Sequence, residues 1–195
     1  MSVDPSAHPT TLDYGSLAAH GITRHQLRAL TGAGEYARIA PGLFLRAGAA
    51  DDTTAAWMAI AAKRPQATLC LLSALALHEL ADEIPTRSHI AIPRGTHPIE
   101  APTAPIVWHR FDAVTFDIGR GEHRLPGGLL IGLYSAERTI IDSFRLRHDW
   151  GADLAIEALK RWLRTRESNP SALLAMAASF PNARPAIRAA LEILL

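Results

Sequence analysis

The sequence predicts an α+β protein: an N-terminal abbreviated winged helix-turn-helix followed by a mixed α/β domain with an all-helical C-terminal part. Three observations predict this class. Two short helical segments precede a hairpin pattern near the N-terminus, strand-like apolar runs recur in the middle of the chain, and helix signals dominate after Ser135. We therefore expect two domains, residues 1–48 and residues 49–195.

Composition is that of an ordinary globular protein and argues against several classes. Of the 195 residues, 48% are hydrophobic and 20% are charged, which is typical of a globular chain. No window approaches the ~18 apolar residues of a membrane helix, and the N-terminus has no signal-peptide pattern. We expect a cytoplasmic protein with no membrane partner.

Charge and cysteine content limit the ligands. A formal net charge of +1 creates no strong field over the whole molecule, so any contact with DNA must come from a local patch. Cys70 is the single cysteine, which excludes an intramolecular disulfide and a cysteine-rich metal site. The nine histidines lack the spacing that would converge on one ion. We expect neither a metal nor a cofactor.

Local signals predict two helices near the N-terminus. Residues 1–12 contain two prolines among small polar residues and should form a loose lead-in. Asp13 can cap a short helix that ends near His20, and Thr23 can cap a second helix over residues 24–32.

Residues 36–46, YARIAPGLFLR, carry a hairpin pattern with a turn at Pro41 and Gly42. Together with the two helices this pattern predicts a winged helix-turn-helix, whose second helix would enter the major groove and whose hairpin would be the wing. The residues expected to contact DNA are Thr23, Arg24, His25, Arg28 and Arg38. The alternative is a solvated helix face in a domain that binds nothing, and the sequence leaves both open.

The larger domain is predicted from its own signals. Residues 51–64 should form a helix, because acidic residues at the start and basic residues at the end suit the helix dipole. LLSALALHEL should form a second, buried helix. The expected strands are residues 89–93, 105–110, 114–118 and 129–134. The expected C-terminal helices are residues 135–147, 152–166, 170–179 and 183–195. The last helix has an apolar stripe that should close the core, with a partner surface as the alternative.

The stretch LYSAERTIIDSFR, residues 133–145, places Glu137, Arg138 and Asp142 among apolar residues, as an active site or a helix start would. Ser135 is the expected N-cap, and Glu137 in the first turn suits the positive end of the helix dipole. Arg138 and Asp142 are four residues apart and can pair along one helix face. This explains every charge without catalysis, so we expect Glu137, Arg138 and Asp142 to have a structural or partner-contact role.

No established catalytic motif is present. The sequence contains no Walker loop, no G-x-G-x-x-G after a strand, no H-E-x-x-H and no G-x-S-x-G. We therefore predict no catalytic residue.

Five segments in order give the chain a family resemblance. They are PGLFLR, LLSALALHEL, the strand pair HIAIPRG and IVWHR, the Y-x-x-E-R-T-I-x-D run in LYSAERTIIDSFR, and the C-terminal tail from ALKRWLRTR to LEILL. Together they resemble the AbiEi family, the antitoxins of the AbiE toxin–antitoxin systems of bacteria and archaea. The family's first helix looks missing or reduced here, because only twelve residues precede Asp13.

The resemblance implies a non-enzymatic antitoxin in two parts. Its winged helix would bind promoter DNA and repress its own operon, with Thr23, Arg24, His25, Arg28 and Arg38 in the DNA-reading positions. Its C-terminal domain would oppose a cognate nucleotidyltransferase-like toxin. Two alternatives stay open: an antitoxin that modifies its toxin as an atypical kinase, and a plain transcriptional regulator without a toxin.

Overall fold

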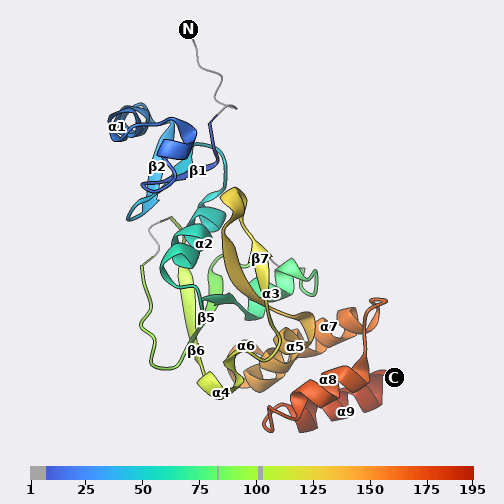
Figure 1. Ribbon diagram of the computed structural model, residues 1–195. Coiled ribbons are helices and arrows are strands. Elements are labelled where there is room, and N and C mark those ends of the chain that lie inside the picture. The colour runs from blue at the N-terminus through green and yellow to red at the C-terminus, as the bar shows by residue number, and fades with distance from the viewer. Residues whose placement is uncertain (1–7, 83, 101–102) are drawn as a thin grey trace. The chain divides into compact units, whose positions relative to one another are not determined.

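A computed structural model describes residues 8–82, 84–100 and 103–195 and confirms the α+β class. The chain forms two compact units (Figure 1). The N-terminal unit comprises Met1–Gln66, Ile99–Pro105 and His123–Ile131, and the C-terminal unit comprises Ala67–Pro98, Ile106–Glu122 and Gly132–Leu195. Residues 1–7 of the expected lead-in lie outside the described residues.

The N-terminal unit contains a three-stranded antiparallel sheet of order β1-β3-β2. The strands are β1 (Thr11–Asp13), β2 (Tyr36–Ala40) and β3 (Leu43–Arg46). The β2–β3 hairpin is therefore present as predicted, and β1 adds to it with Leu12 opposite Phe44. Helix α1 (Arg24–Gly32) lies against β2 (Figure 1). The core of this part consists of Leu12, Leu17, Leu27, Tyr36 and Phe44.

The helix expected between Asp13 and His20 is wrong for most of its length. Asp13 ends β1, and its carboxylate accepts the backbone N–H groups of Gly15 at 2.7 Å and Ser16 at 2.9 Å. These bonds close a turn, and only the 3₁₀ segment η2 (Ala18–His20) follows. The strand forms because Leu12 is fully buried against β3, so tertiary packing outweighs the local cap signal.

Helix α2 (Asp52–Lys63) also belongs to the N-terminal unit and confirms the predicted helix. The Asp51 side chain caps it by accepting the N–H of Thr54 at 2.7 Å. Its alanine-rich face is buried and packs against β2 and β3. The small side chains allow a close approach of helix and sheet.

The second sheet has five strands in the order β6-β5-β4-β8-β7. The strands are β4 (Thr68–Leu69), β5 (Ser88–Pro93), β6 (Ile106–Phe111), β7 (Arg120–Arg124) and β8 (Leu130–Tyr134). It is a mixed sheet, since β4 runs antiparallel to β5 but parallel to β8. Three predicted strands correspond to β5, β6 and β8. Strand β4 is too short and β7, RGEHR, too polar to carry a clear strand signal.

The strand expected at residues 114–118 is wrong, because the chain forms helix α4 (Ala113–Phe116) there. The Asp112 side chain caps this helix by accepting the N–H of Val114 at 2.9 Å. At the other end, the buried Arg138 guanidinium donates to the carbonyls of Thr115 and Ile118. Backbone groups at both ends of the helix thus have hydrogen-bond partners. These bonds outweigh the strand preference of the β-branched residues Val114 and Thr115.

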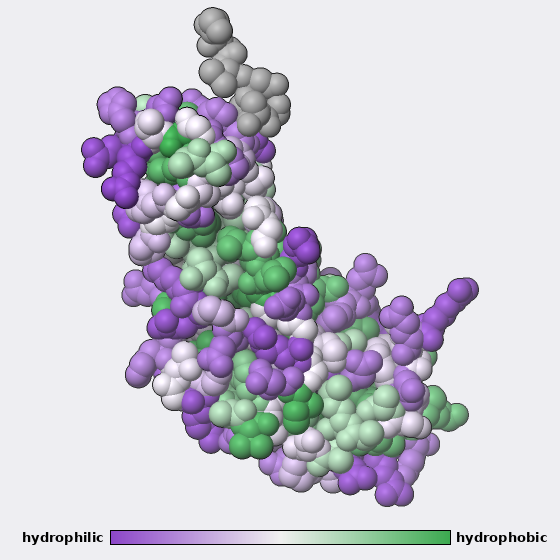
Figure 2. Space-filling model, viewed as in Figure 1, coloured by the Kyte–Doolittle hydropathy of each residue, from purple (hydrophilic) through white to green (hydrophobic). Residues whose placement is uncertain are grey.

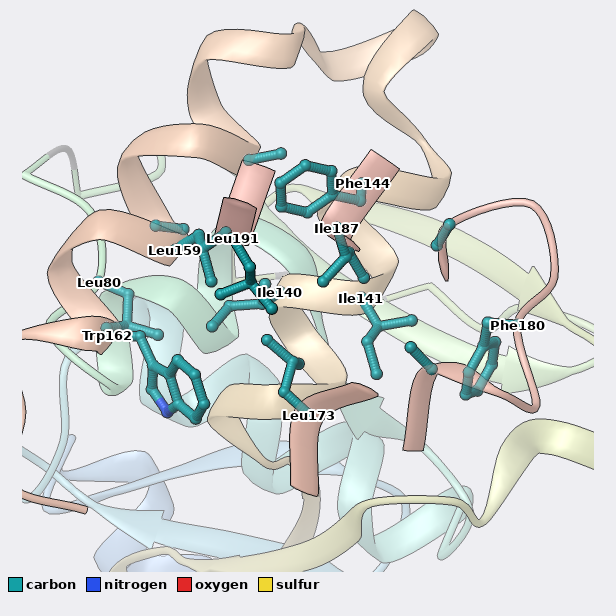
Figure 3. Close-up of a cluster of buried hydrophobic side chains, with 14 of the residues drawn as sticks. Leu80, Ile140, Ile141, Phe144, Leu159, Trp162, Leu173, Phe180, Ile187 and Leu191 are labelled. Atoms are coloured by element: carbon teal, nitrogen blue, oxygen red, sulfur yellow. The ribbon is translucent and has the colours of Figure 1, made fainter. Parts of the chain in front are cut away.

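Helices form the rest of the C-terminal unit. They are α3 (Leu71–Leu77), α5 (Ala136–Arg145), α6 (Arg147–Trp150), α7 (Ala152–Leu163), α8 (Pro170–Ala177) and α9 (Arg184–Leu194). Apolar side chains of α3, α7, α8 and α9 pack around Ile140 and Ile141 of α5 (Figure 3). The last helix docks on this core as expected, with Ile187 and Leu191 buried.

Candidate functional site

The start of α1 is fixed by a reciprocal cap. The Thr23 hydroxyl accepts the backbone N–H of Gln26 at 3.2 Å, and the Gln26 side chain accepts the backbone N–H of Thr23 at 2.8 Å. This capping box satisfies two backbone donors and holds the first turn of the helix in one conformation. The arginines that follow Thr23 therefore project from a well-defined helix start.

A groove of about 520 Å³ lies between α1 and the β2–β3 hairpin. Its lining residues are Tyr14, Arg24, Leu27, Arg28, Thr31, Gly32, Arg38 and Phe44. Three of these residues are arginines, and no described residue of the lining carries a carboxylate. The surface around α1 shows hydrophilic residues at its outer edge beside neutral and hydrophobic ones (Figure 2). The groove therefore concentrates positive charge on a chain that is nearly neutral overall.

The structure brings three of the five predicted DNA-contact residues together in the groove and leaves two outside it. Arg24, Arg28 and Arg38 are exposed and come together in the groove, although Arg38 lies on a different element from the other two. Thr23 has its side chain engaged in the capping box. His25 is exposed on α1 but does not line the groove.

The segment 133–145 forms a buried ionic cluster. Arg138 and Asp142 have no exposed surface, and Arg138 Nε donates to Asp142 Oδ2 at 3.0 Å. The pair predicted from the four-residue spacing is therefore present. Arg145 Nη2 lies 3.0 Å from Asp142 Oδ1 and forms a second ion pair with this carboxylate. One carboxylate thus faces two guanidinium groups.

Aromatic rings surround the Arg138 guanidinium. Its carbon lies 4.3 Å from the centroid of the Tyr134 ring and 4.5 Å from that of Phe180. Its Nη1 donates to the carbonyls of Thr115 and Ile118, both at 2.6 Å. Gly119, at φ +69°, passes so close that an added Cβ would lie 2.7 Å from Arg138 Cβ. Sequence spacing could not reveal these partners.

Electrostatics of this cluster favour a structural role. Burial raises the pKa of the Asp142 carboxyl, and Arg138 and Arg145 act in the opposite direction. Glu137 is half-buried in the first turn of α5. Because Arg138 and Asp142 are fully buried, no substrate can reach them in this structure. The atypical-kinase alternative, which this cluster motivated, gains no support from the geometry.

A second polar cluster, missed in the sequence, joins two strands. His109 Nε2 of β6 lies 3.1 Å from His89 Nδ1 of β5, and the rings stack with centroids 5.1 Å apart. Trp150 packs edge-on against His89 at 4.6 Å. The pKa of each histidine is lowered to about 4, mainly by burial; His109 and Arg87 contribute to this shift at His89, and Arg145 contributes at His109. Both imidazoles are therefore neutral near pH 7.

Neither cluster has the composition of a metal site. Within residues 8–82, 84–100 and 103–195, no group of three or more His, Cys, Asp or Glu side chains could hold an ion. In the same described part of the chain, no helix is long and apolar enough to cross a membrane.

Comparisons with known proteins show the fold and little else. No protein-family model matches the chain, and no curated protein matches it. Among solved structures, the chain is similar to the crystal structure of the RV2827C protein from Mycobacterium tuberculosis, with 15% sequence identity and a TM-score of 0.52. The match covers 96% of this chain and 78% of that one. At this identity the likeness supports a shared architecture and says nothing of function.

Proposed function

We propose that this protein is an AbiEi-type antitoxin that represses its own operon by binding promoter DNA through the α1–hairpin groove. The DNA-binding part of this proposal rests on the groove, whose described lining residues include Arg24, Arg28 and Arg38 and no Asp or Glu. Arginine side chains are common phosphate contacts in protein–DNA interfaces, and a helix-turn-helix places its second helix in the major groove. The toxin-neutralising half rests on the resemblance of the five sequence segments.

The arrangement suits contact with the DNA backbone more clearly than it suits base reading. Arg24 and Arg28 are four residues apart on one face of α1, and Arg38 faces them from β2. Phosphate contacts would fix the position of α1 on the duplex, while the exposed His25 could face base edges. Each arginine bound to a phosphate should release counterions and make affinity dependent on salt.

Removing the three arginines should separate repression from toxin neutralisation. A chain with Arg24→Ala, Arg28→Ala and Arg38→Ala should lose repression of a reporter fused to the operon promoter, with DNA affinity at least about 100-fold weaker. The same chain should still rescue growth when co-expressed with the cognate toxin. The matched control is Arg124→Ala, which removes an exposed arginine of the same unit outside the groove.

Each outcome has a defined meaning for the proposal. A wild-type chain that fails to repress the promoter, or a triple variant that represses as well as wild type, would contradict the DNA-binding half. A wild-type chain that fails to rescue growth from the nucleotidyltransferase-like toxin would contradict the antitoxin half.

A further inference from the structure

Tyr14 occupies an unusual place between the two elements of the groove. It follows β1 in the turn closed by the Asp13 carboxylate, and its side chain is 51% exposed. The Arg24 guanidinium carbon lies 5.4 Å from the centroid of the Tyr14 ring. An aromatic ring beneath a cation at this distance attracts it electrostatically.

Besides Arg24, the Tyr14 ring contacts the β2–β3 hairpin. Its ring meets Phe44 of β3 in an edge-to-face arrangement, with centroids 5.7 Å apart. At the hairpin turn, a Cβ built on Gly42 would lie 3.5 Å from Tyr14 Cδ2. Phe44 is itself buried in the core of the unit, so it gives the tyrosine ring a firm backing. The ring therefore links the hairpin to the first residue of α1.

Arg24 depends on this ring for its placement. Among the described residues, no carboxylate lies within ion-pair distance of Arg24. Without an anchor, an exposed arginine samples many rotamers, and ordering it at an interface costs conformational entropy. A ring that restrains the guanidinium while leaving its N–H donors unpaired reduces that cost, because the donors stay free for a phosphate.

We propose that Tyr14 is a positioning residue of the DNA interface: its ring holds the Arg24 guanidinium at the groove, ready for a backbone phosphate. This inference rests on the proposed function and adds a residue that the sequence pattern did not indicate. The ring, and not the hydroxyl, performs the role, so phenylalanine should replace tyrosine without loss.

The test is a double-mutant cycle in DNA affinity. Fluorescence anisotropy at fixed salt measures the affinity of each variant for duplex DNA from the region upstream of the operon. Tyr14→Leu should weaken binding about 2- to 5-fold, the range expected of one exposed cation–π contact. The same change should have no effect when Arg24 is already alanine, but its full effect when Arg28 is alanine. Tyr14→Phe should bind as wild type does. Circular dichroism of each variant checks that the fold is retained.

The possible failures are distinguishable. If Tyr14→Leu weakens binding equally in the Arg24→Ala and wild-type backgrounds, the ring does not act through Arg24 and this inference is overturned. A Tyr14→Phe variant as weak as Tyr14→Leu would overturn it too, since the hydroxyl would then be the contact. If Arg24→Ala and Arg28→Ala bind as well as wild type, the proposed function itself fails, and this inference fails with it.

Discussion

Replacing Asp142 with asparagine is expected to lower the free energy of unfolding of the C-terminal unit by about 3–5 kcal/mol. The carboxylate faces Arg138 and Arg145, each at 3.0 Å, and Asp142 and Arg138 have no exposed surface. The amide keeps the shape of the side chain but removes the counter-charge of two guanidinium groups. Removing one partner of a buried ion pair leaves the other charge without compensation in the core, which is the main cost.

The free energy of unfolding can be measured by chemical denaturation, with tryptophan fluorescence as the signal. The matched control is Asp82→Asn, which breaks the exposed ion pair with Arg161 in the same unit and should leave the midpoint nearly unchanged. If Asp142→Asn were as mild as the control, the buried cluster would not hold β8, α4 and α5 together.

Acidification from pH 7 to pH 4 is expected to destabilise the C-terminal unit through His89 and His109. The pKa of each is lowered from 6.5 to about 4 in the folded protein, so the unfolded chain binds protons first as the pH falls. Stability contributed by the neutral pair is fully present above about pH 7, declines below 6.5 and levels off near 4. For one histidine this corresponds to about 3 kcal/mol.

The measurement is the free energy of unfolding at a series of pH values. The variant His109→Gln should flatten the decline between pH 6.5 and 4.5, where carboxyl groups of lowered pKa contribute little. His148→Gln, which changes an exposed histidine, should leave the curve unchanged. A wild-type curve that stays flat over this interval would show that the histidine pair does not resist protonation.

Short-range signals predicted much of the fold. The Thr23 cap, the Pro41–Gly42 turn and the Ser135 cap each act within a few residues, and each lies where the pattern placed it. The apolar stripe of the last helix similarly indicated which of its faces is buried. Such features depend on local backbone chemistry, which a single sequence displays directly.

The errors came from contacts between distant residues. Residues 114–118 were expected to form a strand, but they include the end of α4, where the Thr115 carbonyl accepts a hydrogen bond from Arg138, more than twenty residues away. The first predicted helix gave way to β1 because Leu12 packs beneath Phe44. No local pattern encodes either partner.

In the candidate site, too, local signals were predicted and contacts between distant residues were not. Arg24 and Arg28 follow from helix spacing, and Arg38 from its place in the hairpin. Tyr14 did not stand out, since its importance depends on the distances to Arg24 and Phe44. The His89–His109 pair was hidden for a related reason: it depends on the register of two parallel strands, in which His109 pairs with Ala91 and His89 with Val107.

The salt dependence of DNA binding tests the central claim most directly. Affinity for the upstream duplex should be measured over a range of salt concentrations for wild type and for the variant lacking Arg24, Arg28 and Arg38. The slope of log affinity against log salt should be about 2.7 smaller in magnitude for the variant, because each lost phosphate contact removes ~0.9. Equal slopes for the two proteins would contradict the claim that this groove binds the DNA backbone.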